Sequence, residues 1–260
     1  MRLHVHEWGD PETPPVVCVH GVSAHGRRFR RLAEERLTER FRVLAPDLRG
    51  HGRSGWEPPW NLETHVADLL ETFGELGAVP WVGHSFGGRL VLELAAVAPG
   101  RLAAALLLDP AIQLLPHVGF DFAQQATKDG AFATPAEAIE ARVTSGTVTP
   151  REALEEEARE HLERAADGLL RWRCSRAAVA AIYGELCREP PAAGVLAEIP
   201  SLLVHAEHFG LVLDDQLAEY AQVAELVAVP GGHVVYWDAF EQTADAVEKF
   251  LIRHALVTDT

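Results

Sequence analysis

The sequence predicts an α/β domain in which a mostly parallel sheet is flanked by helices and carries an inserted helical cap. Two observations lead to this expectation. Short apolar runs alternate with longer helical patterns along most of the 260 residues, and this alternation stops between residues 114 and 197. The hydrophobic content of 48% is enough for a sizeable core. We therefore expect residues 1–113 and 198–260 to form the core of the fold, and residues 114–197 to form the cap.

The expected strands are short and apolar. Residues 3–8 alternate apolar and polar side chains, as a half-exposed edge strand does, whereas residues 16–19 are continuously apolar, as in a strand buried on both faces. The further predicted strands are residues 41–45, 81–83, 104–108, 202–205 and 226–229. The predicted helices are residues 29–37, 62–76, 90–98, 216–223 and 238–251, with Asn61 as the N-cap of the second.

The segment proposed as a cap contains no convincing strand and is typical of several short helices. Two places in it, at Thr134-Pro135 and Thr149-Pro150, put a Thr before a Pro and a Glu three residues after the Thr. This pattern is a strong helix start, because the Thr accepts from a free N–H and Pro suits the first helical position. We expect Thr134 and Thr149 to be N-caps.

Charge and cysteine content limit the partners and the location of the protein. The net charge of −15 argues against nucleic acid and against an anionic membrane surface, which both attract clustered Lys and Arg. No stretch approaches the roughly 18 apolar residues that span a bilayer, and the first residues do not resemble a secretory signal. Three cysteines without a CxxC pair indicate reduced thiols and no cysteine-based metal site. We expect a cytoplasmic protein that binds no metal.

The segment Gly83-His84-Ser85-Phe86-Gly87 carries the clearest chemical signal. It follows an apolar strand pattern and precedes a helical one, which is the context that a nucleophile elbow requires. In such an elbow a serine occupies a strained turn, and glycines two residues before and after it let the strand and helix approach closely. The sequence therefore predicts Ser85 as a nucleophile.

A serine hydroxyl needs an adjacent base at neutral pH, and His233 is the predicted base. It lies in Gly231-Gly232-His233, after the last predicted strand and before the final helix. A histidine in this loop follows the serine in chain order, as the Ser–acid–His order requires. His84 and His208 are the next histidines to consider if His233 is not the base.

The chain resembles the α/β-hydrolase superfamily along nearly its whole length, and in particular its capped, esterase-like members. The segments that carry the resemblance are Val19-His20-Gly21-Val22, Asp47-Leu48-Arg49-Gly50-His51-Gly52-Arg53-Ser54, Gly83-His84-Ser85-Phe86-Gly87-Gly88 and Gly231-Gly232-His233. The resemblance implies an α/β-hydrolase fold with an oxyanion hole made by the backbone amides of Val22 and Phe86. It also implies that the Asp47–Ser54 loop supports the site without reacting.

The catalytic acid is where the sequence departs from the family pattern. The family usually places an Asp shortly after the strand predicted at 202–205, and Phe209 stands at that position here. Asp109, which follows the strand at 104–108, is an alternative that the superfamily also uses, and Glu207 is a second. We expect Asp109 to orient His233. A structural Asp beside Pro110, or a dyad without an acid, remains open.

The function expected from these residues is that of a serine hydrolase cleaving a carboxylic ester or lactone through an acyl-enzyme on Ser85, without cofactor or metal. C–C bond hydrolysis, amide hydrolysis, perhydrolysis and a non-enzymatic ligand sensor of the same fold remain open. Epoxide hydrolase and dehalogenase chemistry is disfavoured, because those relatives use Asp where this chain has Ser85. The expected partner is a small ester-like molecule. The expected pocket residues are His20, Trp60, Phe120 and Trp172, and Phe122 and Tyr183 are further candidates.

Overall fold

The computed structural model describes residues 1–128 and 130–255. Its main sheet has seven strands in the order β1-β3-β2-β4-β5-β8-β9, with β1 antiparallel at one edge and every other pairing parallel. The strands are β1 Val5–Trp8, β2 Pro15–Val19, β3 Arg42–Pro46, β4 Val79–His84, β5 Leu102–Leu108, β8 Ser201–Ala206 and β9 Glu225–Val229. The predicted mostly parallel sheet with an N-terminal edge strand is confirmed.

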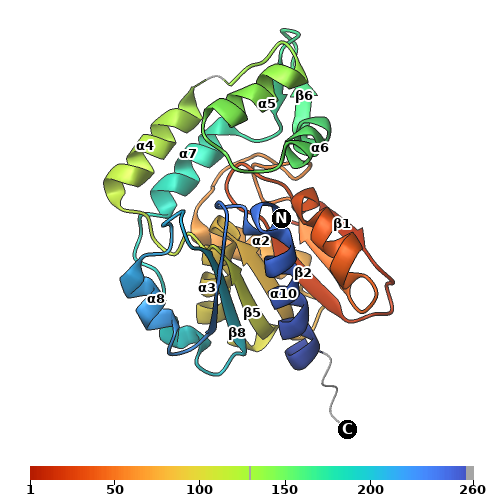
Figure 1. Ribbon diagram of the computed structural model, residues 1–260, viewed down its shortest axis with the longest axis vertical. Coiled ribbons are helices and arrows are strands. Elements are labelled where there is room, and N and C mark those ends of the chain that lie inside the picture. The colour runs from red at the N-terminus through yellow and green to blue at the C-terminus, as the bar shows by residue number, and fades with distance from the viewer. Residues whose placement is uncertain (129, 256–260) are drawn as a thin grey trace.

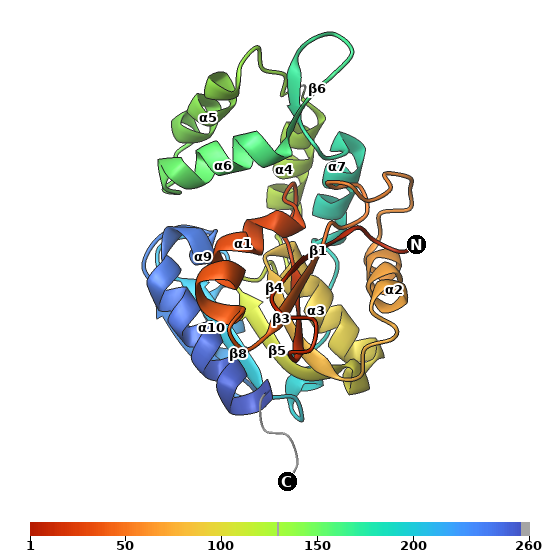
Figure 2. The same ribbon diagram turned by 90° about the vertical axis from the view of Figure 1, so that its right-hand side faces the viewer.

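Helices cover both faces of this sheet, with α2 and α3 on one side and α1, α9 and α10 on the other (Figure 2). Alternate residues of β2 show the pattern: Val17 and Val19 pack toward α3, whereas Val16 and Cys18 pack toward the opposite helices. The helices of the core are α1 Arg30–Leu32 (between a 3₁₀ turn Gly26–Phe29 and a π turn Ala33–Leu37), α2 Leu62–Thr72, α3 Phe86–Val97, α8 Asp214–Tyr220, α9 Val235–Asp238 and α10 Phe240–Ala255.

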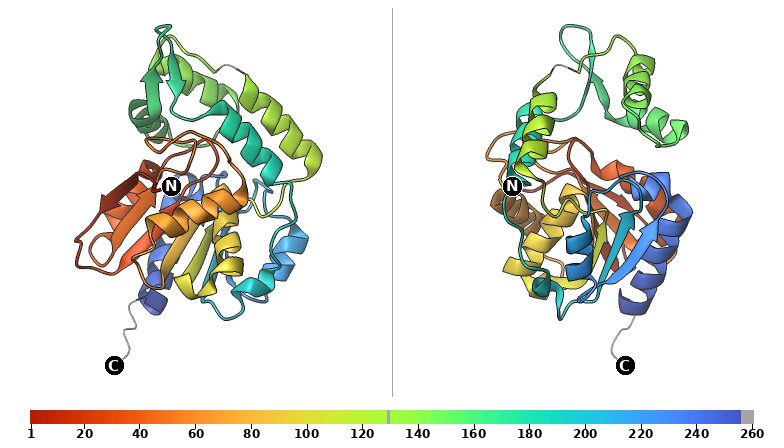
Figure 3. Two further views of the ribbon diagram at one scale, coloured as in Figure 1. Left: turned by 180° about the vertical axis from the view of Figure 1, so that it is seen from behind. Right: turned by 60° about the vertical axis from the view of Figure 1, so that its left-hand side comes forward.

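The segment between β5 and β8 stands over the sheet as a separate layer (Figures 1 and 3). It contains the helices α4 Pro116–Thr127, α5 Pro135–Thr144, α6 Arg151–His161 and α7 Arg176–Glu185, and the strands β6 Leu162–Arg164 and β7 Leu170–Trp172. The expectation that this segment has no strand is wrong, because β6 and β7 form an antiparallel hairpin that also bonds to Phe132. Strands of three residues are too short to show a period in the sequence. We call residues 114–197 the cap.

The two helix starts predicted in the cap behave differently. Thr134 caps α5 as expected, since its Oγ1 accepts from the Glu137 N–H at 3.3 Å. Thr149 does not cap α6, which begins at Arg151 after an N-cap Pro150 without a side-chain bond. The Thr149 hydroxyl instead donates to Asp238 Oδ1 at 2.7 Å. A tertiary contact with the core has replaced the local cap.

Arg89 of α3 fastens both ends of the cap to the core. Its buried guanidinium donates to the carbonyl oxygen of Ile112 at 2.6 Å, before the cap begins, and to that of Glu189 at 2.9 Å, near its end. Charge-assisted bonds of this kind are stronger than neutral ones. The cap therefore leaves and rejoins the core beside the helix that follows Ser85.

A second buried cation joins the far side of the cap to the core. Arg28 lies in the 3₁₀ turn before α1, and its Nε donates to both oxygens of Glu157 on α6, at 3.0 and 2.9 Å. Both side chains are buried. Burial acts to raise the pKa of Glu157, but Arg28 and His25 outweigh it and hold that pKa well below its usual value. Glu157 is therefore ionised and paired.

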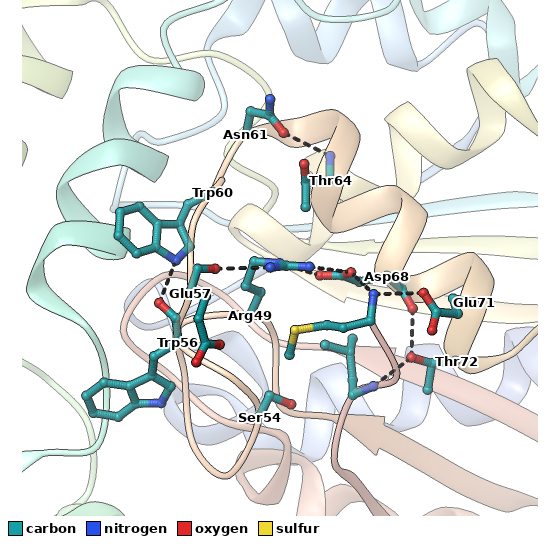
Figure 4. Close-up of polar contacts among 12 residues, drawn as sticks. Arg49, Ser54, Trp56, Glu57, Trp60, Asn61, Thr64, Asp68, Glu71 and Thr72 are labelled. Carbon is teal, nitrogen blue, oxygen red and sulfur yellow. Dashed lines mark hydrogen bonds and ion pairs between the residues drawn. The ribbon is translucent and has the colours of Figure 1, made fainter.

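The loop after β3 is braced by the ion pair between Arg49 and Asp68 (Figure 4). Asp68 lies on α2, and its two oxygens accept from Arg49 Nη2 and Nε at 2.8 and 2.7 Å. The N-terminal amine of Met1 also contacts Asp68, at 2.5 Å. Arg49 Nη1 further donates to the Glu57 carbonyl oxygen at 3.0 Å, next to Trp56. This network fixes the path by which the loop brings Trp56 toward the cap.

Among the described helices, none combines the length and apolar character needed to cross a bilayer.

The Glu157→Ala variant should be destabilised by about 3–5 kcal/mol, because it leaves the Arg28 guanidinium buried without its partner. The matched control is Glu156→Ala, which removes a half-exposed pair with Arg30 on the same helix and should cost less than about 1 kcal/mol. Urea unfolding of both variants measures the difference. The wild-type advantage should be full above the unfolded Glu pKa of about 4.3 and should decline as the pH falls toward the lowered folded value. Equal losses in the two variants would contradict the assignment.

Candidate active site

Ser85 sits in a sharp turn between β4 and α3, with φ 54° and ψ −116°. This is a strained conformation for a residue with a side chain. The turn is held from both sides: the Ser85 N–H donates to the Leu108 carbonyl at 3.1 Å, and the Ser85 carbonyl accepts from the N–H of Ala111 at 3.0 Å. The end of β5 therefore fixes the conformation of the serine.

The glycines around Ser85 are required by close backbone contacts. A Cβ on Gly87 would lie 2.1 Å from the Val19 carbonyl oxygen, and one on Gly83 would lie 2.4 Å from the Gly87 carbonyl oxygen. No side chain fits at such distances, so the strand and helix approach as the elbow pattern predicts. The sequence signal and the backbone geometry agree here.

The loop after β2 passes directly over Ser85. A Cβ on Gly21 would lie 2.9 Å from Ser85 Cβ and 3.3 Å from its Oγ, so only glycine allows this approach. The next residue is Val22, and Phe86 is the first residue of α3. Within residues 1–128 and 130–255 neither backbone N–H donates to a protein acceptor. Two free N–H groups thus lie in the residues adjoining Ser85, one of them at a helix N-terminus.

Asp109 and His233 are in direct contact. Asp109 directly follows β5 and is fully buried, and its Oδ2 lies 2.7 Å from His233 Nδ1. Its other oxygen accepts from the Ala206 N–H at 3.1 Å, and its own N–H donates to Val204 O of β8. Two neighbouring strands therefore hold this carboxylate. With Nδ1 donating to Asp109, the other ring nitrogen of His233 is left as an acceptor.

The His233 ring is packed between two aromatic side chains. Phe209 stacks on it with the ring centroids 4.9 Å apart and an interplanar angle of 14°. His84 lies on it at 4.7 Å, and its Nε2 donates to the His233 carbonyl at 2.9 Å. Burial and the nearby His233 lower the pKa of His84 well below its usual value, so His84 is neutral. These contacts fix the ring against His84, the residue before Ser85, and no hydrogen bond joins Ser85 Oγ to His233 among the described residues.

The second predicted acid, Glu207, lies on the surface. Its side chain is exposed, as is that of His208, and in the described part of the chain neither forms a hydrogen bond to His233. The turn after β8 therefore brings Phe209, and not the Glu207 carboxylate, against the His233 ring.

A cavity of about 720 Å³ lies between the cap and two loops of the core. The core contributes Ser23 and Trp56, and the cap contributes three of the candidates named from the sequence, Phe122, Trp172 and Tyr183. Ser23 is two residues beyond Gly21, so the cavity reaches the loop that covers Ser85. Trp56 was not predicted from the sequence, because it reaches the cavity only through the loop that the Arg49–Asp68 ion pair holds in place. The aromatic lining of this cavity suits an apolar group.

Three predicted pocket residues lie elsewhere. His20 has no exposed surface, its Nδ1 lies 2.7 Å from the Gly21 carbonyl oxygen, and its Nε2 accepts from the Leu48 N–H at 2.9 Å, so its assignment to the pocket is corrected. It joins the two loops beneath the site instead. Phe120 is 61% exposed on α4 and Trp60 donates to the Trp56 carbonyl oxygen, and neither lines the cavity.

His4, His6 and Asp47 form a group with metal-ligand chemistry, with one ligand atom from each within 4.8 Å of the others. Asp47 is already engaged: His6 Nε2 lies 3.1 Å from its Oδ1, and the N–H groups of Gly26 and Arg53 donate to its two oxygens, each at 2.8 Å. A carboxylate with these bonds holds the loop after β3 in place. The expected support role of the Asp47–Ser54 loop fits this geometry.

A family model for the alpha/beta hydrolase fold matches residues 14–240. The chain belongs to the α/β-hydrolase family. Its relatives include Lipase LipV of Mycobacterium tuberculosis, which is 38% identical over 194 residues that make up 73% of each chain. The pimeloyl-[acyl-carrier protein] methyl ester esterase of Methylococcus capsulatus is 42% identical over 99 residues, which span 36% of each chain.

Solved structures of this α/β-hydrolase family share the whole fold, cap included. E-2-(acetamidomethylene)succinate hydrolase superposes with a TM-score of 0.84, at 24% identity, over 96% of this chain and 95% of that one. At this identity the likeness establishes the fold alone. The seven-stranded sheet and the predicted fold class are therefore confirmed.

The Gly87→Ala variant should be destabilised by about 1–3 kcal/mol or more, because the added methyl group meets the Val19 backbone, which cannot move without disturbing β2. The control is Gly100→Ala, where no atom lies within 4 Å of the new Cβ and stability should change by less than about 0.5 kcal/mol. Urea unfolding midpoints measure both. A wild-type midpoint for Gly87→Ala would show that the elbow tolerates a side chain.

Proposed function

We propose that this α/β-hydrolase cleaves carboxylic esters or lactones through an acyl-enzyme on Ser85. The observation that carries the proposal is the 2.7 Å contact between Asp109 and His233, formed beside a serine at positive φ. This contact supports an enzyme over a non-enzymatic ligand sensor, because it gives His233 a carboxylate partner even though Phe209 stands at the usual acid position. The names of two relatives, a lipase and a methyl ester esterase, support the same substrate class.

Each residue has a defined task in this proposal. Ser85 Oγ attacks the ester carbonyl while His233 Nε2 takes its proton, and His233 then protonates the leaving alcohol. Asp109 selects the tautomer with the proton on Nδ1 and stabilises the imidazolium ion. The N–H groups of Val22 and Phe86 donate to the developing oxyanion. Water then hydrolyses the acyl-enzyme, with His233 again as base, and the cycle needs no cofactor.

The cap cavity is the proposed site of the substrate's apolar group. Its aromatic lining of Trp56, Phe122, Trp172 and Tyr183 offers large apolar surfaces, and Ser23 connects it to the oxyanion loop. The same machinery serves amide or C–C bond hydrolysis in related folds. A panel of p-nitrophenyl esters, lactones and anilides ranks these reactions directly.

A fluorophosphonate probe should label Ser85 and abolish ester hydrolysis in step with labelling. Ser85→Ala should neither label nor turn over, and its unfolding midpoint should stay close to that of the wild type. Intact-mass and peptide mass spectrometry locate the adduct. An adduct on another serine, or steady-state turnover by Ser85→Ala, would remove the proposed nucleophile.

Asp109→Asn should lower kcat by about 10³- to 10⁴-fold, since an amide at this position favours the wrong tautomer of His233. Glu207→Gln is the matched control: the side chain is exposed and its substitution should leave turnover nearly unchanged. Both variants are assayed for kcat and for thermal midpoint. If Asp109→Asn lost stability but kept its turnover per folded molecule, the residue would be structural.

A further inference from the structure

Arg142 is a cation on the inner face of the cap. It lies on α5 three and four residues after Ile139 and Ala138, which are both buried, so all three side chains share one helical face. This face packs toward α6, where Ile139 joins Leu154 in a small apolar cluster. The Arg142 side chain is half-buried, and Arg28 and Asp238 of the core are among its charged neighbours.

This guanidinium has no hydrogen-bond acceptor and no ion-pair partner among residues 1–128 and 130–255. Of the described arginines that likewise lack one, Arg53 and Arg159 are exposed to solvent. Buried or partly buried charges are normally paired, because the loss of hydration must be compensated. Burial and the repulsion of Arg28 lower the pKa of Arg142, consistent with an uncompensated charge.

The charged and polar groups near Arg142 come from both the cap and the core. Its electrostatic neighbours are Arg28, Glu157, Asp238 and Tyr183. Tyr183 lines the cavity, whereas Asp238 accepts from the N–H of Val234, the residue after His233. Arg142 is therefore near one residue that lines the cavity and near the side chain that holds the segment after His233.

The two neighbouring carboxylates are already engaged. Glu157 is paired with Arg28 through two bonds from Nε, and Asp238 accepts from Thr149 and from the Val234 N–H. Both repel an anion, but Arg28 and Arg142 offset their two charges. The chain has a net charge of −15, which repels an anionic substrate. Such a substrate would therefore need a local cation to attract it, and the unpaired guanidinium of Arg142 is one.

We propose that Arg142 binds a carboxylate carried by the ester substrate. A planar guanidinium matches a carboxylate through two parallel N–H···O bonds, and a partly desolvated site strengthens them. This inference rests on the proposed ester hydrolysis and narrows its substrates to esters that bear a carboxylate. The apolar part of such a substrate occupies the cavity, and its anionic group faces α5.

The test compares charged and neutral esters of matched size. One pair, the p-nitrophenyl hemiester of glutaric acid and p-nitrophenyl valerate, places the carboxylate on the acyl side. The other pair, 4-carboxyphenyl butyrate and 4-carbamoylphenyl butyrate, places it on the alcohol side. In at least one pair Arg142→Gln should lower kcat/KM for the anionic ester about 10- to 100-fold, chiefly through KM, and leave its neutral match unchanged.

Two further variants make this result specific. Arg142→Lys keeps the charge but not the two-pronged geometry, and should recover part of the affinity for the anionic ester. Arg159→Gln removes an unpaired but exposed arginine of α6 and should change neither ester. Equal losses for anionic and neutral esters in Arg142→Gln would make the residue structural and overturn the proposal, as would no charge-dependent loss in either pair.

A binding measurement separates this inference from the proposed reaction. Calorimetric titration of the Ser85→Ala protein with glutarate should show binding that Arg142→Gln weakens by a similar factor, whether or not the wild type hydrolyses esters. Binding without any ester turnover would contradict the proposed function and support the carboxylate site. Normal ester turnover with no glutarate binding that depends on Arg142 would support the function and contradict the site.

Discussion

The structure depends on how closely three backbone segments approach one another around Ser85. The chain after β2, the turn after β4 and the end of β5 meet with contacts that leave no room for a Cβ at Gly21, Gly83 or Gly87. The positive φ of Ser85 is held by two hydrogen bonds from the chain at and after the end of β5. Strain at a functional residue persists only where surrounding structure determines it, and here three strands of the sheet do so.

The cap is joined to this rigid centre by buried charges as well as by apolar contacts, since Ile182, Leu186 and Leu196 of the cap belong to the main apolar cluster of the core. Arg89 bonds to carbonyl groups at both ends of the cap, and Arg28 pairs with Glu157 in the middle. Both guanidinium groups are buried, and their charge is compensated by these hydrogen-bond acceptors. Arg142 lies in the same interface without such acceptors, which is why its charge is available to a ligand while those of the other two are not.

Most of the fold and the centre of the site could be predicted from the sequence because both are local. Apolar runs mark the strands, and the elbow glycines surround Ser85 within five residues. The β6–β7 hairpin was missed because its strands are too short to show a period. The hydrogen bond of Thr149 to Asp238 and the burial of His20 could not be predicted, because each depends on a partner far along the chain. Arg142 gave no signal for the same reason: only the folded cap shows that a charged residue faces inward unpaired.

The position of the Asp109 carboxylate explains the contacts made by the turn after β8. When Asp109 at the end of β5 contacts His233, residues 207–210 no longer need to supply a carboxylate. The turn instead brings Phe209 parallel to the imidazole at 4.9 Å, where it covers one face of the ring while His84 packs against it at 4.7 Å. Asp109 is fixed by β8 through Ala206 and Val204, so this strand positions the carboxylate that contacts His233 without containing it. With the carboxylate at the end of β5 instead of β8, its contact with His233 is kept, and Phe209 after β8 packs on the imidazole ring.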